Sequence, residues 1–318
     1  MYKDLVALVH DGHLMGDAEK RAKGENSYRG DVCLNVSELT NQTNFTEVRE
    51  YRGYWPLTYE EKELARKKQW NWTDSILIRF GFITRAYNEY VEQLLNVLTE
   101  DHFPDVICIN STFWDISRWE EVRPSKDKNG FNYYPTFQRN IERLCDFIRR
   151  KEMEAINKCT LLQPCLKIWR TSMPIAAETK GGVLEGKGEN NSAMYREDIA
   201  RCNLNLIPIM NEKKWDVLDA NFWFRNCQEQ FRENDGIHWT AHAHRWLTNI
   251  FLSHLAEAWG LGWPTYPIND HSKSTVGAKK FKGVPLEGLF TFDDETRKIR
   301  ETRGPDDILC AEQLRPLN

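Results

Sequence analysis

The stretch "DVICINSTFWDISRW", Asp105 to Trp119, carries the strongest indication of the fold. Its apolar run begins after an aspartate and ends in the polar pair Asn110 and Ser111. A short apolar run bounded by turn residues is typical of a buried strand, and strands buried on both faces are typical of parallel sheets. We therefore expect an α/β domain in which Asn110 stands at the carboxyl end of a strand.

Outward from this stretch, similar apolar runs alternate with longer segments of helical period. Strands are expected at residues 46–51, 75–82, 105–110, 165–172 and 215–220. Helices are expected at residues 2–9, 86–98, 136–156, 194–207 and 240–259. This alternation indicates βαβ units and a mostly parallel sheet.

The pattern also sets the domain boundaries. It runs from the start of the chain to "WGLGWP" and then stops, because the sequence from Pro264 onward is polar with weak periodicity. Such a composition buries too little apolar surface to offset the entropy lost on ordering. The sequence predicts one domain over residues 1–263 and a largely disordered tail over residues 264–318.

Composition narrows the class of protein. The 318 residues are 41% hydrophobic and 28% charged, with a net charge of -4 and a pI near 6.1, so neither nucleic acid nor an anionic membrane is an expected partner. The eight cysteines form no CxxC pair, which favours free thiols in a reducing compartment. The start "MYKDLVALVHDGH" does not resemble a signal peptide, and no apolar run approaches the ~18 residues of a membrane span. We expect a cytoplasmic protein, with the N-x-S/T sequons present by chance.

A second stretch, "ENDGIHWTAHAHRW", Glu233 to Trp246, suggests chemistry. Asp235 precedes His238 by three residues, ahead of the last expected helix, where Thr240 can serve as N-cap. A carboxylate at this spacing can hold one ring nitrogen of a histidine that acts as general base through the other. The alternative is a metal site formed by His238, His242 and His244, but no glutamate lies between the first two and a helix would point His244 away from His238.

Asn110 has two interpretations of its own. At the carboxyl end of a strand its amide N–H groups can donate to a developing oxyanion. An isolated asparagine in this position more often caps a turn.

Together the two stretches resemble blocks of the SGNH (GDSL-type) hydrolases. The long run "DGIHW…HAHR…LSHLAEAWG", with "YKDLVALV", "VREY", "VICINSTFWDISRW" and "WRTSMP", resembles more closely the PC-esterase domain-containing proteins of animals, from Tyr2 to Gly260. The resemblance implies a three-layer α/β/α fold and acyl-ester hydrolysis by Ser, His and Asp, without a cofactor or metal. It assigns His238 as base, Asp235 as its orienting partner, and Asn110 and Gly24, in "AKGENS", as oxyanion-hole residues.

The resemblance also exposes a difference. Family members carry Gly-Asp-Ser at the end of a first, central strand just before the segment that matches "YKDLVALV", and the sequence contains no Gly-Asp-Ser. The similar "LMGDAEKRA" has Ala18 where the serine would stand. We expect that the first strand is missing from this chain and that the chain does not turn over an acylated small molecule or glycan as written. The alternative is a non-catalytic binding or scaffold module, and no protein partner is predicted.

Overall fold

The fold is described from a computed structural model. It describes residues 1–12, 14–15, 19, 27–34, 48–54, 75–100, 102–117, 134–158, 164–176, 179–180, 191–227 and 231–259, the side chains of residues 191–195 excepted. Gly24 and the segment 264–318 lie outside these residues, so the oxyanion role of Gly24 and the disorder of the tail stay predictions.

Three strands form the parallel sheet that the apolar runs predict. They are β4 (Val106–Ile109), β5 (Leu166–Arg170) and β6 (Asp216–Leu218), in the order β4-β5-β6. In this register Ile109 is opposite Trp169, so Asn110 and Arg170 both follow at the carboxyl edge of the sheet. Polar side chains at this edge have the position that α/β folds use for binding and catalysis.

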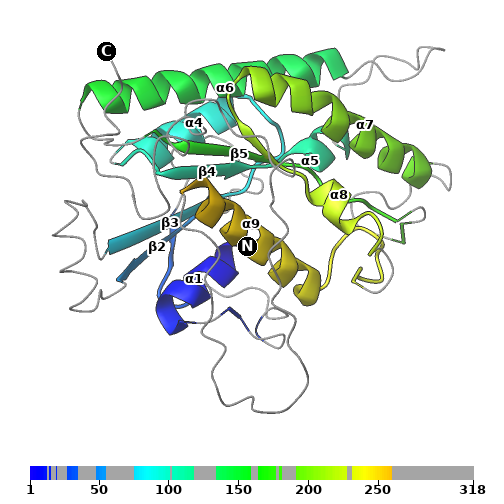
Figure 1. Ribbon diagram of the computed structural model, residues 1–318, viewed down its shortest axis with the longest axis horizontal. Coiled ribbons are helices and arrows are strands. Elements are labelled where there is room, and N and C mark those ends of the chain that lie inside the picture. Colours follow the sequence, from blue (N-terminus) through cyan, green and yellow to red (C-terminus); the bar gives the residue numbers. More distant parts are fainter. Residues whose placement is uncertain are drawn as a thin grey trace, which may run out of the picture.

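Helices cover both faces of this sheet, which makes three layers (Figure 1). On one face, Ile107, Trp169 and Val217 pack in a cluster with α4 (Glu89–Thr99), α6 (Tyr134–Asn157) and α7 (Asn191–Glu212). On the other face, Ile168 and Leu218 pack against α8 (Ala220–Phe224) and α9 (Ala241–Ala258). Successive side chains along each strand therefore pack on opposite faces of the sheet, as the pleat of a strand requires.

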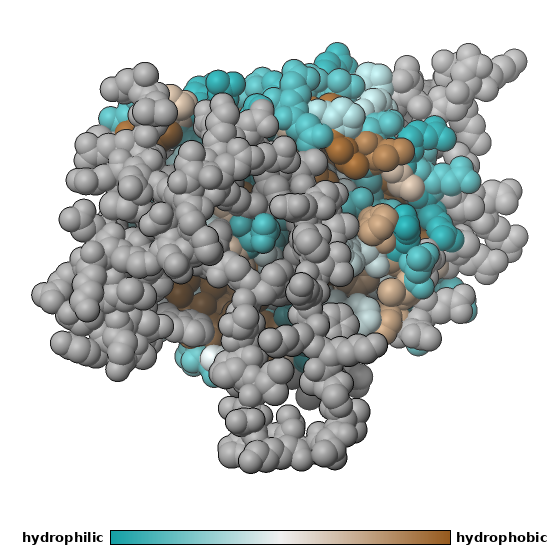
Figure 2. Space-filling view, viewed as in Figure 1, coloured by the Kyte–Doolittle hydropathy of each residue, from teal (hydrophilic) through white to brown (hydrophobic). Residues whose placement is uncertain are grey.

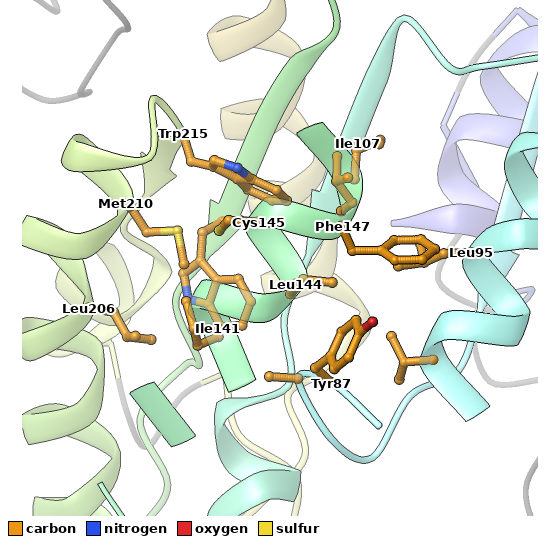
Figure 3. Close-up of a cluster of buried hydrophobic side chains, with 14 of the residues drawn as sticks. Tyr87, Leu95, Ile107, Ile141, Leu144, Cys145, Phe147, Leu206, Met210 and Trp215 are labelled. Atoms are coloured by element: carbon orange, nitrogen blue, oxygen red, sulfur yellow. The ribbon is translucent and has the colours of Figure 1, made fainter. Parts of the chain in front are cut away.

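The core on the α6 face is densely filled (Figure 3). Ile141, Leu144 and Ile148 recur along α6 at helical spacing, and each is at most 1% exposed. In Figure 3 Ile141 and Leu144 share the cluster with Trp215, Met210 and Leu206 from the α7 side. In Figure 2 the outer surface over α6 is mostly hydrophilic, so this helix is amphipathic, as its sequence predicts.

The remaining strands correct the expectation of a mostly parallel sheet. β1 (Val32–Leu34), β2 (Val48–Tyr54) and β3 (Ser75–Gly81) form a separate antiparallel sheet in the order β1-β2-β3. The physical reason lies in "VREYRGY", where three of the seven residues are charged. A parallel strand is buried on both faces, whereas an antiparallel sheet can leave one face to water. The other face packs against α1 (Tyr2–Asp11).

The five expected helices are confirmed as α1, α4, α6, α7 and α9, with ends that differ from the predicted ranges by a few residues. Two short helices, α5 (Thr112–Ser117) and α8, were not predicted, because five or six residues are too few to display a helical period. Within the described residues, the structure contains no helix with the length and hydropathy of a membrane span.

Candidate active site

The loop that carries Asp235 and His238 is a closed, hydrogen-bonded turn ahead of α9. Arg232 and Trp239 form an antiparallel bridge, and the Glu233 N–H donates to the His238 carbonyl over 2.8 Å. Gly236 has φ +75°, a left-handed conformation that residues with a Cβ rarely adopt. The sequence "ENDGIHW" therefore folds back on itself and brings the acid to the histidine.

Asp235 binds His238 in the way that a base and its orienting acid require. One oxygen, Oδ2, contacts the ring Nδ1, and the other, Oδ1, accepts the backbone N–H groups of Ile237 and His238 over 2.8 and 2.9 Å. Burial alone would raise the pKa of Asp235, but the hydrogen bonds from the His238 ring and from these two amides outweigh it and lower the pKa. The acid is therefore ionised at neutral pH, which favours the Nδ1–H tautomer of the imidazole.

The other ring nitrogen of His238 remains available. The His238 side chain is 70% exposed, and Nε2 makes no hydrogen bond within the described part of the chain. An imidazole held at Nδ1 and open at Nε2 has the arrangement of a general base.

This loop is attached to the segment that follows β5. The Gly236 carbonyl accepts the Ala176 N–H over 2.8 Å, and the Asp235 carbonyl accepts the Lys180 N–H over 3.0 Å. Arg232 adds bonds to the carbonyls of Pro174 and Gly236, over 2.6 and 3.1 Å, and its guanidinium lies over the Trp239 ring. The loop is therefore fixed relative to the carboxyl edge of the parallel sheet.

Asn110 lies at the same edge and contacts the beginning of the same segment. Its Nδ2 donates to the Arg170 carbonyl over 2.5 Å and lies 3.1 Å from Ser172 Oγ, while Asn110 Oδ1 lies 3.2 Å from that hydroxyl. The Ser172 hydroxyl can accept from Nδ2 and donate to Oδ1 at the same time, because it has one donor hydrogen and two acceptor lone pairs. One Nδ2 hydrogen of Asn110 then points to the Arg170 carbonyl and the other to Ser172, and the second is available to a ligand only when it leaves Ser172.

A buried polar network around Ser172 supports Asn110, and sequence reasoning did not predict it. The Ser172 backbone exchanges hydrogen bonds with the amide of Asn203, and Asn221 donates to the Ser172 carbonyl over 3.1 Å. Ser172 Oγ also accepts the Phe113 N–H over 3.2 Å, which ties α5 to β5. These partners lie 31 to 59 positions apart in the sequence. The polar residues at the ends of the expected strands are the sequence signal that could have indicated this network.

Asp115 is a second residue whose environment the sequence did not reveal. It is buried within α5, and Oδ2 accepts the Ala86 N–H over 2.8 Å. Burial raises the pKa of Asp115 to about 7, although the nearby Ser111 hydroxyl, the Arg85 charge and the Ala86 amide oppose the shift. The carboxyl group joins the loop before α4 to the turn that follows Asn110.

The three histidines of "HWTAHAH" have different surroundings. The His242 ring stacks on Phe231 with its centroid 5.4 Å away, and His244 lines an internal cavity. Within the described residues no group of three His, Cys, Asp or Glu side chains is placed to hold a metal ion. Thr240 is the N-cap of α9 by position, but its side chain makes no capping bond.

Comparison with known proteins identifies relatives of the chain by sequence. No family model matches the sequence, and no solved structure matches it. Human PC-esterase domain-containing protein 1A is 32% identical over 267 residues, which is 83% of this chain and 50% of the relative. The chain belongs to the family of PC-esterase domain-containing proteins. The human protein 1B is 29% identical over 90% of the chain, and its rat counterpart 33% identical over 83%. The chain spans 58% and 54% of these two PC-esterase domain-containing proteins, so it covers little more than half of their length.

Proposed function

We propose that this chain is the acyl-ester hydrolase domain of a PC-esterase-type protein, with an SGNH-like active site. The observation that carries the proposal is the Asp235–His238 pair, in which Nδ1 is bound and Nε2 is open. The name of the relatives supports an esterase, and the position of the pair beside the carboxyl edge of the sheet suits one. The proposed substrate is an acylated small molecule or glycan.

In the proposed reaction His238 Nε2 removes the proton from a serine hydroxyl as the serine oxygen attacks the ester carbonyl. The C–O bond to the alcohol then breaks, and the imidazolium returns its proton to the leaving oxygen, which leaves an acyl-serine. Water repeats the sequence and releases the acid. Asp235, which is ionised at neutral pH, stabilises the imidazolium that forms in both halves of the reaction.

The oxyanion of each tetrahedral intermediate needs donors that are already in place. We assign this role to Asn110, whose Nδ2 can move one of its hydrogen bonds from Ser172 to the oxyanion. Gly24 is proposed as a second donor through its backbone amide. The network through Asn203 and Asn221 would hold Ser172 and, through it, the amide plane of Asn110.

The nucleophile is the part of this mechanism that we do not assign within the 318 residues, because no Gly-Asp-Ser occurs in them. Ser111 directly follows Asn110, but it is fully buried at the start of α5. A buried hydroxyl beside the oxyanion donor lacks the exposed strand-to-helix turn of a nucleophile. We propose that the chain as written shows no serine-dependent turnover and that a serine delivered on a preceding first strand restores it.

The test compares hydrolysis of p-nitrophenyl acetate by the chain as written and by a chain extended ahead of Met1 with an apolar strand ending in Gly-Asp-Ser. We expect only the extended chain to turn over. His238→Ala should lower its kcat by a factor of roughly 10³ or more, while the control Met153→Ala, at an exposed position on α6, should leave it within about twofold. Turnover by the unextended chain that is lost in Ser111→Ala would overturn the assignment of the nucleophile. Absence of turnover in both chains would favour a non-catalytic binding module.

A further inference from the structure

The outer face of α9 carries aromatic and amide side chains where a solvent-exposed helix usually carries charges. Its exposed residues are His242, Trp246 and Asn249, which follow one another at the spacing of one helical face. Within α9, all of which the structure describes, no lysine, arginine, aspartate or glutamate is exposed to this degree. The exposed face of α6, by contrast, includes Arg143 and Asp146. An uncharged, partly aromatic outer face favours contact with a ligand over contact with water alone.

Phe231, from the turn ahead of α9, joins two of these residues in a cluster of rings, which we call the aromatic platform. The Phe231 ring centroid lies 5.4 Å from that of His242, with the planes 15° apart, and 4.9 Å from that of Trp246. The centroids of His242 and Trp246 are 5.3 Å apart. Rings at these separations attract one another, so the side chains lose rotational freedom before a ligand arrives. Trp246 is nevertheless 40% exposed, so the platform is a preformed aromatic surface open to solvent.

The aromatic platform lies on the same side of its turn as His238. Arg232 and Trp239 form the bridge of this turn, and their side chains meet on its inner side, with the guanidinium 4.5 Å from the Trp239 ring centroid. Successive side chains of a paired segment point to opposite sides, so Phe231 and His238, each one residue before a member of the bridge, both point to the outer side. Such diagonal neighbours lie about 7–8 Å apart. A ligand that rests on the platform can therefore reach the open Nε2 of His238.

Polar side chains stand at both ends of the platform. Asn249 follows Trp246 by three residues on the same helical face. Glu233 is opposite His238 across the turn, where its N–H donates to the His238 carbonyl over 2.8 Å. Both Asn249 and Glu233 are exposed, and an amide and a carboxylate can each bond to hydroxyl groups. The surface thus combines aromatic faces with hydrogen-bonding groups at its edges.

This combination fits a hexopyranose ring. One face of such a sugar is lined by C–H groups, whose hydrogens are the positive ends of weak dipoles, whereas the face of an aromatic ring is negative. The hydroxyl groups project around the rim of the sugar, where side chains such as Asn249 and Glu233 can bind them. An anion would instead need basic partners, and none of the exposed residues of α9 is basic. A stable protein partner would cover roughly 20–30 residues, far more than the platform offers.

We propose that the aromatic platform of Phe231, His242 and Trp246, with Glu233 and Asn249 at its ends, is a binding site for a hexopyranose ring. In the esterase it is the subsite for the sugar part of an acylated glycan, because a sugar on the platform brings its ester to Nε2 of His238. This second statement rests on the proposed function, whereas sugar binding by the platform does not.

The test measures binding of the methyl β-glycosides of glucose, galactose and N-acetylglucosamine to the full chain by saturation-transfer NMR. We expect at least one of the three to bind, with saturation strongest on the ring C–H protons. Trp246→Ala should weaken this binding by about fivefold or more, and Trp246→Phe should retain most of it, because an aromatic face is kept. The matched control is Phe222→Ala. Phe222 is 43% exposed, but the Arg225 guanidinium lies 3.9 Å from its ring centroid, so this change should leave the affinity within about twofold.

Absence of binding by all three glycosides, or equal affinities in the parent and in Trp246→Ala, would overturn the sugar site. Binding to phosphatidylcholine vesicles instead of the glycosides, with loss in Trp246→Ala, would overturn it in favour of a lipid surface. The measurement needs no nucleophile. Its failure therefore leaves the proposed hydrolysis standing, and absence of turnover in the esterase assay leaves the sugar site standing.

The link to His238 is tested with the 6-O-acetyl ester of the glycoside that binds. We expect a nuclear Overhauser effect between the acetyl methyl protons and the His238 ring protons in the parent, and none in Trp246→Ala. Binding of the ester to the platform without this effect in the parent would overturn its role as a substrate subsite.

Discussion

Replacing Asp115 by asparagine should make the protein more stable at pH 8 and remove part of its dependence on pH. The carboxyl group is buried in α5, and its pKa rises from 3.8 to about 7 in the folded chain. The folded state therefore keeps a proton that the unfolded state releases, so the free energy of unfolding falls as pH rises from about 4 to about 7 and levels off above that. A shift of this size corresponds to an effect on the order of 4 kcal/mol, at about 1.4 kcal/mol per pKa unit. Asparagine carries no charge and can still accept the Ala86 N–H.

The assay is urea unfolding of the parent and of Asp115→Asn at several values between pH 4 and pH 9. The difference between the two free energies of unfolding isolates Asp115 from all other titrating groups. We expect the variant to gain relative to the parent through this window, by a few kcal/mol at pH 8, and to gain nothing further above pH 8. A constant difference between the two proteins from pH 4 to pH 9 would refute a raised pKa at this position.

Three further changes test the packing. Leu144→Ala removes a fully buried side chain from α6 and should lower the free energy of unfolding by about 2–5 kcal/mol. The control Met153→Ala, at a half-exposed position on the same helix, should lower it by less than about 0.5 kcal/mol. Equal losses in urea unfolding would contradict the burial of Leu144 in the core. Asp219→Ala removes the N-cap of α8 and the partner of the Thr171 hydroxyl, and calorimetry should show a loss of about 1–2 kcal/mol rather than none. Deletion of residues 264–318 should leave the melting temperature within about 2 °C of the parent, and a larger fall would show that the tail contributes to the fold.

The hydrophobic pattern was sufficient to predict the strands that are buried in the parallel sheet. The runs at 105–110, 165–172 and 215–220 contain β4, β5 and β6, because a short, mainly apolar run bounded by turn residues is typical of a strand buried in a sheet. Pattern did not give the pairing of β2 and β3. The charged residues of "VREYRGY" favour a sheet with one face in contact with water, but the direction of the neighbouring strand depends on contacts that are distant in sequence.

The candidate site likewise contains one contact that the sequence predicted and others that it did not. Asp235 and His238 are three residues apart, so the sequence was enough to predict their contact, and the structure confirms it. Ser172 contacts Asn110, which lies 62 positions away, and the cavity that His244 lines is formed by segments from both ends of the domain. Neither could be predicted from local spacing, because both depend on how the strands are ordered in the two sheets.

Covalent labelling of the extended chain with a fluorophosphonate, which reacts with an activated serine, tests most directly whether His238 acts as the general base. Peptide mass spectrometry then locates the adduct. We expect the label on the serine of Gly-Asp-Ser in the extended chain, and a rate of labelling lowered by about a hundredfold or more in His238→Ala. Labelling at the same rate in His238→Ala would contradict a serine that His238 activates.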